Sequence, residues 1–536
     1  MYLKTLKKTE KKEFDYIKVE LRQHEVIFLN LKHKTQNNRM NFEKLIKIKT
    51  LGELKASGYK TRSIKEELRE NLIIKLKANE KLFDTIKAFD ETVIPDLQRA
   101  ILSRHNILFL GLRGQAKTKI ARLMTQLLDE YIPVIKESEL NEDPLNPVSK
   151  AGKLLIADKG NNVEIEWLHR DERYTEKLAT PDVSVADLIG DVDPIKAASL
   201  KLPYSDERVI HFGLIPRSHR GIFVINELPD LQARIQVSLF NILEEGDIQI
   251  RGFKLRLPLD IEFIFTANPE DYTNRGAIVT PLKDRIESQI LTHYPKDIET
   301  SKEITLQEAM LSDDQKGKIS SHKLVEDLLE QVAFEARNNE FIDPKSGVSA
   351  RLTISAYENI FSTAERRMLL NNEDKTTIRI SDFWGVIPSI TGKIELVYEG
   401  EQEGSLIVAQ NLIGKAIRKQ FLNYFSDPEK LKKKKEVSPF SEIIEWFAAG
   451  NEADILNDMS NKDFSKILNS IPGLEDAIKK LFPKAKGDEK LLLMEFLLHG
   501  LAEYSMLSKN NLTSGLRFRD LFTSVFSQGR EGSTKY

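Results

Sequence analysis

Short apolar runs alternate with segments of helical spacing over the first half of the chain. The runs ILFL at 107–110, GIFVINE at 221–227 and IEFIFTAN at 261–268 predict buried strands, because each is brief and almost continuously apolar. Between them, KIARLMTQLLDEY at 119–131 and residues 228–245 repeat their apolar positions at helical spacing. Strands that alternate with helices indicate a largely parallel sheet, and therefore an α/β fold.

Smaller elements are predicted around this alternation. Residues 51–79 predict two helices broken near Gly58, and residues 83–104 predict an apolar approach followed by helical spacing from Val93. The polar, proline-containing stretch 133–216 is too long for a plain loop, so it is expected to hold small inserted strands and helices. The segment DIQIRGFKLRL at 247–257 alternates about a central Arg-Gly pair, as a hairpin does.

The second half of the chain is predominantly helical in its pattern. Residues 297–400 are mainly helical, with 349–367 as the clearest helix, and amphipathic helices follow from Phe440. No internal repeat is visible, and the piece from Phe440 onward contains no chemical motif. A docking or oligomerisation unit and a plain helical cap both fit such a segment.

The first 39 residues are rich in lysine and have no sustained period, whereas a regular pattern begins at Met40. Two interpretations stay open for this leader. Translation could begin at Met40, which would leave the leader without a function, or the leader could be a flexible basic arm.

Composition narrows the class of protein. The chain has 536 residues, of which 40% are hydrophobic and 30% charged, and no apolar run approaches the ~18 residues that a membrane span needs. The net charge is −2, from 80 basic and 82 acidic residues, so nucleic acid or an anionic membrane is not expected as a partner. Cysteine is absent, which excludes disulfides and thiolate metal sites and fits a cytoplasmic location.

A phosphate-binding loop follows the first predicted strand. A lysine and a hydroxyl residue close the loop just before a helix, so its backbone N–H groups and the helix N-terminus would face an anion. Lys117 would neutralise the β- and γ-phosphates of ATP, and Thr118 would contact Mg²⁺. The residues that match G-x-x-x-x-G-K-[ST], with alanine in place of the second glycine, are Gly111, Leu112, Arg113, Gly114, Gln115, Ala116, Lys117 and Thr118.

Polar residues end the other two predicted strands. Asn226 and Glu227 follow one strand, and Asn268 ends the next. Open α/β sheets bind ligands at the carboxyl ends of their strands, so these side chains are expected beside the phosphate loop.

Taken in order, these elements resemble the AAA+ ATPases, within the group of magnesium-chelatase subunits and MoxR-type ATPases, over residues 80–370. GLRGQAKT is similar to the MoxR type of Walker A loop. The segment from FGLIPRSHR to DIQIRG is similar to the insert, Walker B strand and hairpin of the chelatases, and TANPEDYTNRG with LKDRI resembles the sensor asparagine and the Asp-Arg element. Ser349-Ala350-Arg351 resembles the start of the second-sensor helix.

The resemblance implies a role for each matching residue. Glu227 would polarise the attacking water, and Asn268 would hold that water or the γ-phosphate in line. Arg351 would reach the γ-phosphate from a helical lid. Arg285 would be the arginine finger that a neighbouring subunit's nucleotide receives, and Arg275 is a weaker candidate for that finger.

The resemblance also implies a domain plan: an α/β P-loop AAA+ core with a parallel sheet, a helical lid and a further α-helical C-terminal region. The expected boundaries are 1–39 for the basic leader, 40–82 for a helical N-terminal segment, 83–295 for the core with an insert at about 180–216, 296–400 for the lid, and 401–536 for the C-terminal region.

One residue departs from the family pattern. The Walker B aspartate that helps to hold Mg²⁺ is Asn226 here, and the missing charge pair is worth up to about 4 kcal/mol at ~4 Å with an effective dielectric near 20. The sequence therefore supports ATP binding more strongly than it supports efficient ATP hydrolysis.

Two functions follow from this pattern. The first is a cytoplasmic ATPase that binds Mg-ATP, forms a homo-oligomeric, hexameric ring and remodels a protein partner, with a von Willebrand factor A domain protein as the expected associate. The second is a nucleotide-binding switch or scaffold that hydrolyses little. An AAA+ transcription activator is disfavoured, because the chain has no GAFTGA loop and no evident helix-turn-helix.

Overall fold

The computed structural model describes residues 45–204, 206–250, 256–269, 277–430, 439–512 and 514–521. The described chain forms two compact units. The first contains the described residues up to Gly111 together with Ala116–Thr292, and the second contains Leu112–Gln115 together with the described residues from His293. None of the helices in these ranges combines the length and the apolar character that crossing a bilayer requires.

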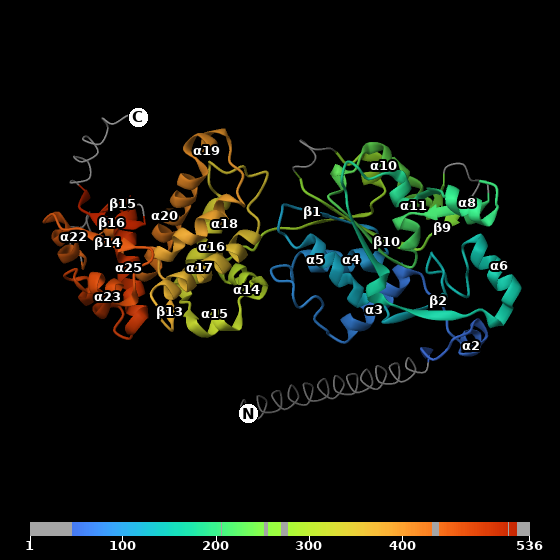
Figure 1. The fold of residues 1–536 in the computed structure, drawn as a ribbon, viewed down its shortest axis with the longest axis horizontal. Coiled ribbons are helices and arrows are strands. Elements are labelled where there is room, and N and C mark those ends of the chain that lie inside the picture. Colours follow the sequence, from blue (N-terminus) through green and yellow to red (C-terminus); the bar gives the residue numbers. More distant parts are fainter. Residues whose placement is uncertain are drawn as a thin grey trace, which may run out of the picture. The chain divides into compact units, whose positions relative to one another are not determined.

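A five-stranded parallel sheet forms the centre of the first unit, in the order β11-β1-β10-β7-β4 (Figure 1). Strands β1, β7 and β10 confirm the three predicted apolar runs, and β7 and β10 are buried over their whole length. The edge strands β4 and β11 were not predicted, because partly exposed polar residues interrupt their apolar signal. The bounds are Ile107–Leu110 for β1, Tyr174–Leu178 for β4, Gly221–Asn226 for β7, Ile261–Ala267 for β10 and Ser288–Leu291 for β11.

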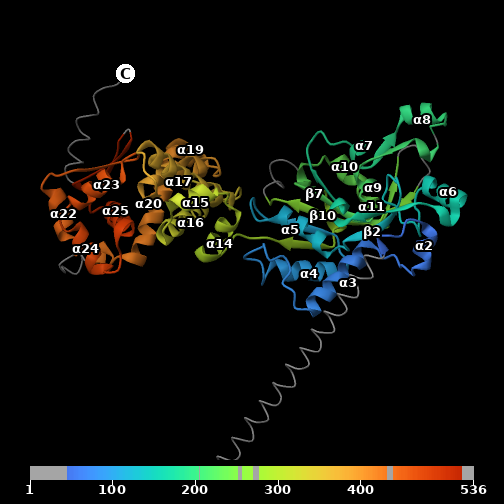
Figure 2. The same ribbon diagram turned by 60° about the horizontal axis from the view of Figure 1, so that its bottom comes forward.

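Helices cover both faces of this sheet. Successive strand side chains point to opposite faces, so Phe109 and Ile264 enter one core while Leu108 and Phe265 enter the other. Figures 1 and 2 show α3 and α4 on one side of the sheet and α10 on the other. The bounds are Ile64–Lys77 for α3, Val93–Ser103 for α4, Lys117–Leu123 for α5, Ala233–Ser238 for α10 and Phe240–Glu245 for α11.

Two predicted helices differ from the observed ones. The segment 119–131 was expected to be one helix, but α5 begins at Lys117 and continues after Leu123 only as the 3-10 turn Met124–Leu127. A 3-10 turn keeps a similar apolar spacing, so periodicity alone does not place the end of the helix. The segment 228–245 divides into a 3-10 turn, α10 and α11, and Pro229, which lacks an N–H donor, lies in the first piece.

The remaining elements of the first unit agree with the sequence pattern. Two helices, α2 (Leu51–Ala56) and α3, precede the core, and the long polar stretch holds short strands and helices as expected. Strands β8 and β9 pair in antiparallel fashion, as the hairpin prediction requires, although its turn at 251–255 lies outside the described residues. The bounds in this part are Tyr131–Ile135 for β2, Lys150–Lys159 for α6, Ile165–His169 for β3, Val185–Leu188 for α7, Gly190–Val192 for β5, Pro194–Leu200 for α8, Ile210–Phe212 for β6, Leu214–Arg217 for α9, Asp247–Gln249 for β8 and Arg256–Pro258 for β9.

A buried ion pair joins α3 to the start of β4. The guanidinium of Arg173 donates to both carboxylate oxygens of Glu67 at 2.7 and 2.8 Å, and each residue is 3% exposed. The backbone N–H of Asp129 donates to the same carboxylate at 2.7 Å, and Arg173 also donates to the carbonyl oxygen of Arg220 at 2.9 Å. The helix before the core is therefore fixed to the sheet by charges that have no access to water.

The second unit is helical with a small sheet. Its helices share one hydrophobic core that extends from Ile319 to Phe518 and includes residues on both sides of position 400. The strands β14, β16 and β15 form an antiparallel sheet that the apolar pattern did not predict, because each strand is short and polar residues occupy much of it. The longer helices are α14 (Ile298–Glu308), α16 (Lys323–Arg337), α17 (Arg351–Leu370), α20 (Ser405–Tyr424) and α25 (Gly487–Glu503), and the strands are Ala453–Leu456, Ser508–Leu512 and Gly515–Arg519.

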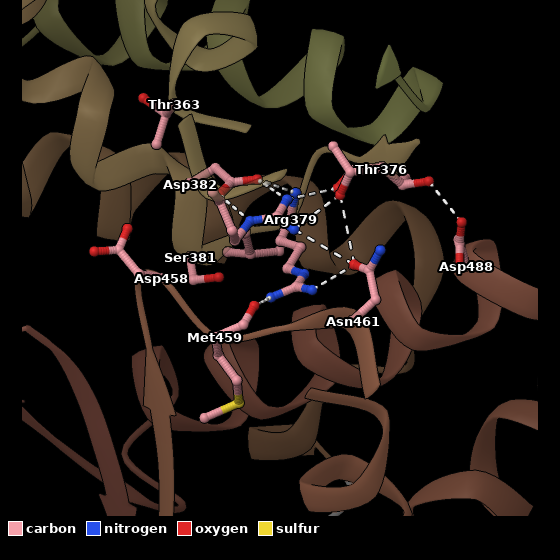
Figure 3. A network of polar contacts seen from close by, with 12 residues as sticks. Thr363, Thr376, Arg379, Ser381, Asp382, Asp458, Met459, Asn461 and Asp488 are labelled. Atoms are coloured by element: carbon pink, nitrogen blue, oxygen red, sulfur yellow. Dashed lines mark hydrogen bonds and ion pairs between the residues drawn. The ribbon is translucent and has the colours of Figure 1, made fainter. Parts of the chain in front are cut away.

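A polar network links the two halves of this unit (Figure 3). Arg367 of α17 forms a buried bidentate pair with Asp382, at 2.9 and 3.1 Å. Arg379 donates to Asn461 at 2.5 Å and to the carbonyl oxygen of Met459 at 2.8 Å. Because Asn461 follows position 400 and its partners Arg367, Thr376 and Arg379 precede it, these hydrogen bonds connect the segments on the two sides of that position.

We predict that Glu67→Ala destabilises the first unit strongly. The substitution leaves the buried Arg173 without its counter-ion, which costs about 3–5 kcal/mol of the free energy of unfolding. Glu70→Ala, in the same helix, removes a carboxylate whose side chain is 45% exposed in its pair with Arg62, and should cost about 1 kcal/mol or less. Denaturant unfolding of both variants checks the difference, and equal losses would contradict it.

We predict a pH-dependent stability from Glu262 on β10. Burial raises the pKa of Glu262 to about 8 from an ordinary value of 4.5, so the folded chain holds a proton that the unfolded chain releases between these values. The free energy of unfolding should therefore fall as pH rises through this window. Glu262→Gln cannot titrate, so its stability should fall less over the same range. Unfolding curves of wild type and variant that stay parallel from pH 5 to 8 would contradict this assignment.

Candidate functional site

The loop after β1 has the backbone that a phosphate cradle needs. Ala116 lies in the left-handed region at φ 55° and Gly114 at φ 73°, and α5 begins at the next residue, Lys117. The alanine that replaces glycine is therefore in a conformation that costs an L-residue roughly 1–2 kcal/mol. Such cost is typical of sites where the surrounding structure enforces a loop shape.

Gly114 is also required by close packing within the second unit. A Cβ atom at this position would lie 2.1 Å from Oγ of Ser349 and 2.9 Å from the backbone nitrogen of Ala350. In the same unit, the hydroxyl of Tyr294 donates to the carbonyl oxygen of Arg113 at 2.8 Å, and the Arg113 guanidinium donates to Ser346. Residues 112–115 thus keep their shape through several contacts.

A chain of polar side chains lies at the carboxyl ends of β1, β10 and β7. Lys117 is 7% exposed, and its ammonium donates to the carbonyl oxygen of Gly111 and, at 2.7 Å, to Oδ1 of Asn268. The amide nitrogen of Asn268 donates to Oε2 of Glu227 at 2.7 Å. The register Leu110 with Ala267 places these strand ends side by side, so three of the predicted residues meet.

A second set of contacts surrounds Asn226. Its side-chain oxygen accepts hydrogen bonds from the hydroxyls of Thr118 at 3.2 Å and Thr266 at 3.1 Å. The backbone N–H of Glu227 donates to Oγ1 of Thr266 at 3.1 Å, and Glu227 itself lies in the left-handed region at φ 55°. The two metal-site candidates, Thr118 and Asn226, are therefore in direct contact.

The sequence pattern did not point to two residues of this cluster, Thr266 on β10 and Glu176 on β4, and Glu176 brings a charge to the site. The amide nitrogen of Asn226 donates to Oε1 of Glu176 at 2.6 Å. The other carboxylate oxygen accepts from Arg122 at 2.9 Å and from the hydroxyl of Tyr174 at 3.0 Å. The only signal in the sequence was a glutamate in the alternating run YTEKL, and without the strand pairing that run does not point to the site.

The donor chemistry at this point fits Mg²⁺ together with nucleotide phosphates. The cluster offers a hydroxyl from Thr118, an amide oxygen from Asn226 and carboxylates from Glu227 and Glu176, which are the hard oxygen donors that this ion prefers. Among the residues that the structure describes, no group of three or more His, Cys, Asp or Glu side chains forms a metal cage. Mg²⁺ in phosphate-transfer sites takes few protein ligands, because phosphate oxygens and water complete its shell.

The arginines of the predicted site lie on other elements. Arg285, at the end of the helix Thr280–Asp284, pairs with Glu244 at 2.6 Å, donates to the carbonyl oxygen of Pro281 at 2.8 Å and stacks on Phe240. Arg351 is the exposed first residue of α17 in the second unit. Arg275 lies outside the described residues.

Comparisons with known proteins add context. No family model matches the chain. Similar solved structures include a model of the BchI–BchD complex of magnesium chelatase, at 18% identity over 60% of this chain and 98% of that one, with a TM-score of 0.30. NtrX from Brucella abortus in complex with ADP matches at 12% identity over 68% and 71% of the two chains, with a TM-score of 0.34. Hsp104 with ATPγS and casein matches at 13% identity over 59% and 49%, with a TM-score of 0.32. Values this low do not identify an activity.

We predict that Gly114→Ala disturbs the loop. A methyl group there meets a strained φ and backbone atoms at 2.9 Å, so the free energy of unfolding should fall by about 1–3 kcal/mol. Gly317→Ala is the matched control, because apart from the adjacent residues and the backbone of its own helix no atom of the described chain lies within 4 Å of the place that a methyl group would take on this exposed glycine. Alanine favours helix over glycine by about 0.5–1 kcal/mol. Thermal unfolding of both variants should show changes of opposite sign, and two changes of the same sign would contradict the prediction.

Proposed function

We propose that this chain is an α/β P-loop ATPase of the AAA+ type, which binds and hydrolyses Mg-ATP, forms a ring and remodels a protein partner. The observation that carries the proposal is the contact chain Lys117, Asn268, Glu227 at the carboxyl ends of adjacent parallel strands. These are the three groups that phosphoryl transfer to water uses: an ammonium that binds phosphate, an amide that orients the water, and a carboxylate that accepts its proton.

The contacts suggest how the site changes when ATP arrives. Lys117 now donates to Gly111 and Asn268, and the phosphates of ATP would take over these hydrogen bonds because they carry more negative charge. Asn268 would then orient the attacking water, and Glu227 would accept its proton. Thr118 and Asn226 would hold bound Mg²⁺, which supplies charge neutralisation for the transferred phosphoryl group.

Ring formation is part of the proposal because Arg285 needs a second subunit. Within its own subunit this arginine is held by Glu244 and Phe240, at the end of a short helix. A neighbouring subunit's nucleotide would draw it away from this exposed pair, which is worth only about 1 kcal/mol or less. We propose a hexamer, with Arg351 as the residue that senses the γ-phosphate.

The partner belongs to the same proposal. By resemblance to the chelatase and MoxR group, a separate protein with a von Willebrand factor A domain is the proposed associate. The insert at 180–216 and the hairpin β8–β9 are the surfaces that we propose to move against the partner. We also propose the domain boundaries that the sequence predicts. A cytoplasmic location is proposed with it.

A second candidate function is a nucleotide-binding switch with little turnover. The observation that favours it is the neutral amide of Asn226 at the position that contacts Thr118. A weakly held Mg²⁺ would leave ATP bound without efficient hydrolysis, because the transferred phosphoryl group would lack part of its charge neutralisation.

We predict that steady-state ATP hydrolysis in Mg²⁺ depends on Lys117 and Glu227. Lys117→Ala should lower nucleotide affinity and turnover by at least about 100-fold, because a buried phosphate ligand is lost. Glu227→Gln should lower turnover by about 100–1,000-fold while ATP stays bound. Lys119→Ala is the matched control, since the ammonium of this neighbouring lysine donates to the carbonyl oxygen of Thr85 at 3.4 Å. Tight ATP binding with negligible turnover in wild type would support the switch instead.

We predict that Arg285 acts on a neighbouring subunit. Arg285→Ala and Glu227→Gln should each be inactive alone, whereas their mixture should regain part of the activity. Mixed rings place an intact arginine beside an intact Glu227 site, so recovery requires action between subunits. Mass photometry with and without ATP checks that rings form, and full activity of Arg285→Ala alone would contradict the finger assignment.

A further inference from the structure

The carboxylate missing from the Walker B strand is present on the neighbouring strand. Glu176 lies on β4, which pairs with β7 in a register that sets Leu178 opposite Asn226. Its Oε1 atom accepts a 2.6 Å hydrogen bond from the amide nitrogen of Asn226. A negative charge therefore lies one amide group away from the position where an aspartate is expected.

Glu176 also decides which way the Asn226 amide points. A carboxylate can only accept hydrogen bonds, so the amide must turn its nitrogen toward Glu176 and its oxygen toward Thr118 and Thr266. The two threonine hydroxyls can donate, which satisfies that oxygen. An asparagine without Glu176 could turn its nitrogen toward Thr118, and a nitrogen donor repels a cation.

The surroundings keep Glu176 an acceptor. The side chain of Glu176 is 23% exposed, and its second oxygen accepts from Arg122 and from the Tyr174 hydroxyl. Arg122 is 64% exposed, so water screens its charge, while Asn226 is 7% exposed. Water therefore screens the Glu176 charge less at Asn226 than at Arg122.

We propose that Glu176 and Asn226 together replace the Walker B aspartate, with Asn226 supplying the oxygen and Glu176 supplying its orientation and the negative charge. The inference rests on the proposed function, because it concerns the Mg²⁺ of that nucleotide site. Glu176 is a positioning residue in this arrangement, since it acts through the amide. Mg²⁺ binding then depends on Glu176 and Asn226 together.

The test is a cycle that exchanges acid and amide. Glu176→Gln removes the charge, Asn226→Asp adds one, and the double variant interchanges the two groups while keeping the net charge and one hydrogen bond. Binding of a fluorescent, non-hydrolysable ATP analogue is measured in EDTA and in Mg²⁺, and the ratio of the two affinities is the metal enhancement. Glu164→Gln is the matched control, because this exposed glutamate pairs with Lys136 outside the cluster. Mn²⁺ binding followed by electron paramagnetic resonance reports on the metal directly.

The effect of Glu176→Gln on the metal enhancement should change sign between the wild-type background and the Asn226→Asp background. Glu176→Gln should lower the metal enhancement by about 10–100-fold, as is usual for a group that orients a metal ligand, and leave the affinity in EDTA within about threefold. In the Asn226→Asp background, Glu176→Gln should instead raise the metal enhancement. It replaces one of two facing carboxylates, which repel each other, by an amide that donates a hydrogen bond to the other. Mn²⁺ affinity should follow the same order, and Glu164→Gln should match wild type.

Arg122→Gln gives a further test that does not disturb the cluster's interior. Removal of this exposed cation should raise the metal enhancement about two- to fivefold, because less of the Glu176 charge is neutralised. An enhancement that Glu176→Gln and Arg122→Gln both leave unchanged would overturn the inference, as would a double variant no better than Asn226→Asp. Failure of the proposed function looks different: the analogue would then not bind in EDTA, or Lys117→Ala would not weaken its binding.

Discussion

The register of the parallel strands is the constraint on which the site depends. Because β1, β10 and β7 run in the same direction with matched ends, Glu227, Asn268 and the loop that leads from β1 to Lys117 reach the same edge of the sheet. That placement, and not any one motif, brings Lys117, Asn268 and Glu227 into hydrogen-bond contact. Apolar cores on both faces fix the register, since a shift by one residue would turn every buried side chain to the wrong face.

Under the proposed function, the same sheet explains how the chain accommodates an asparagine where the ATPases that it resembles carry the Walker B aspartate. Strand β4 adds a partner on the far side of β7, and its Glu176 reaches the amide of Asn226. In the proposed arrangement, Asn226 on β7 supplies the oxygen and Glu176 on β4 supplies the negative charge. The motif's sequence alone shows only that a carboxylate is missing from β7. The structure also shows the carboxylate of Glu176, which contacts Asn226 from the neighbouring strand β4.

Much of the core was predictable from the sequence because its signals are local. Continuous apolar runs identified β1, β7 and β10, and the glycine spacing identified the loop between β1 and α5, whose binding of phosphate stays a prediction. The edge strands and the sheet of the second unit were not predictable, since their residues alternate weakly and gain their conformation from pairing with distant strands. Glu176 was missed for the same reason, because a contact across 50 positions has no local signature.

The most direct test of the central claim is a structure determined with Mg²⁺ and a non-hydrolysable ATP analogue. The account predicts the triphosphate in the loop between Gly111 and Thr118, with the ammonium of Lys117 moved from Asn268 to phosphate oxygens and the Asn226 oxygen on the metal side of its amide. An analogue bound elsewhere, or a loop that keeps the contact between Lys117 and Asn268 while phosphates lie outside it, would contradict the account.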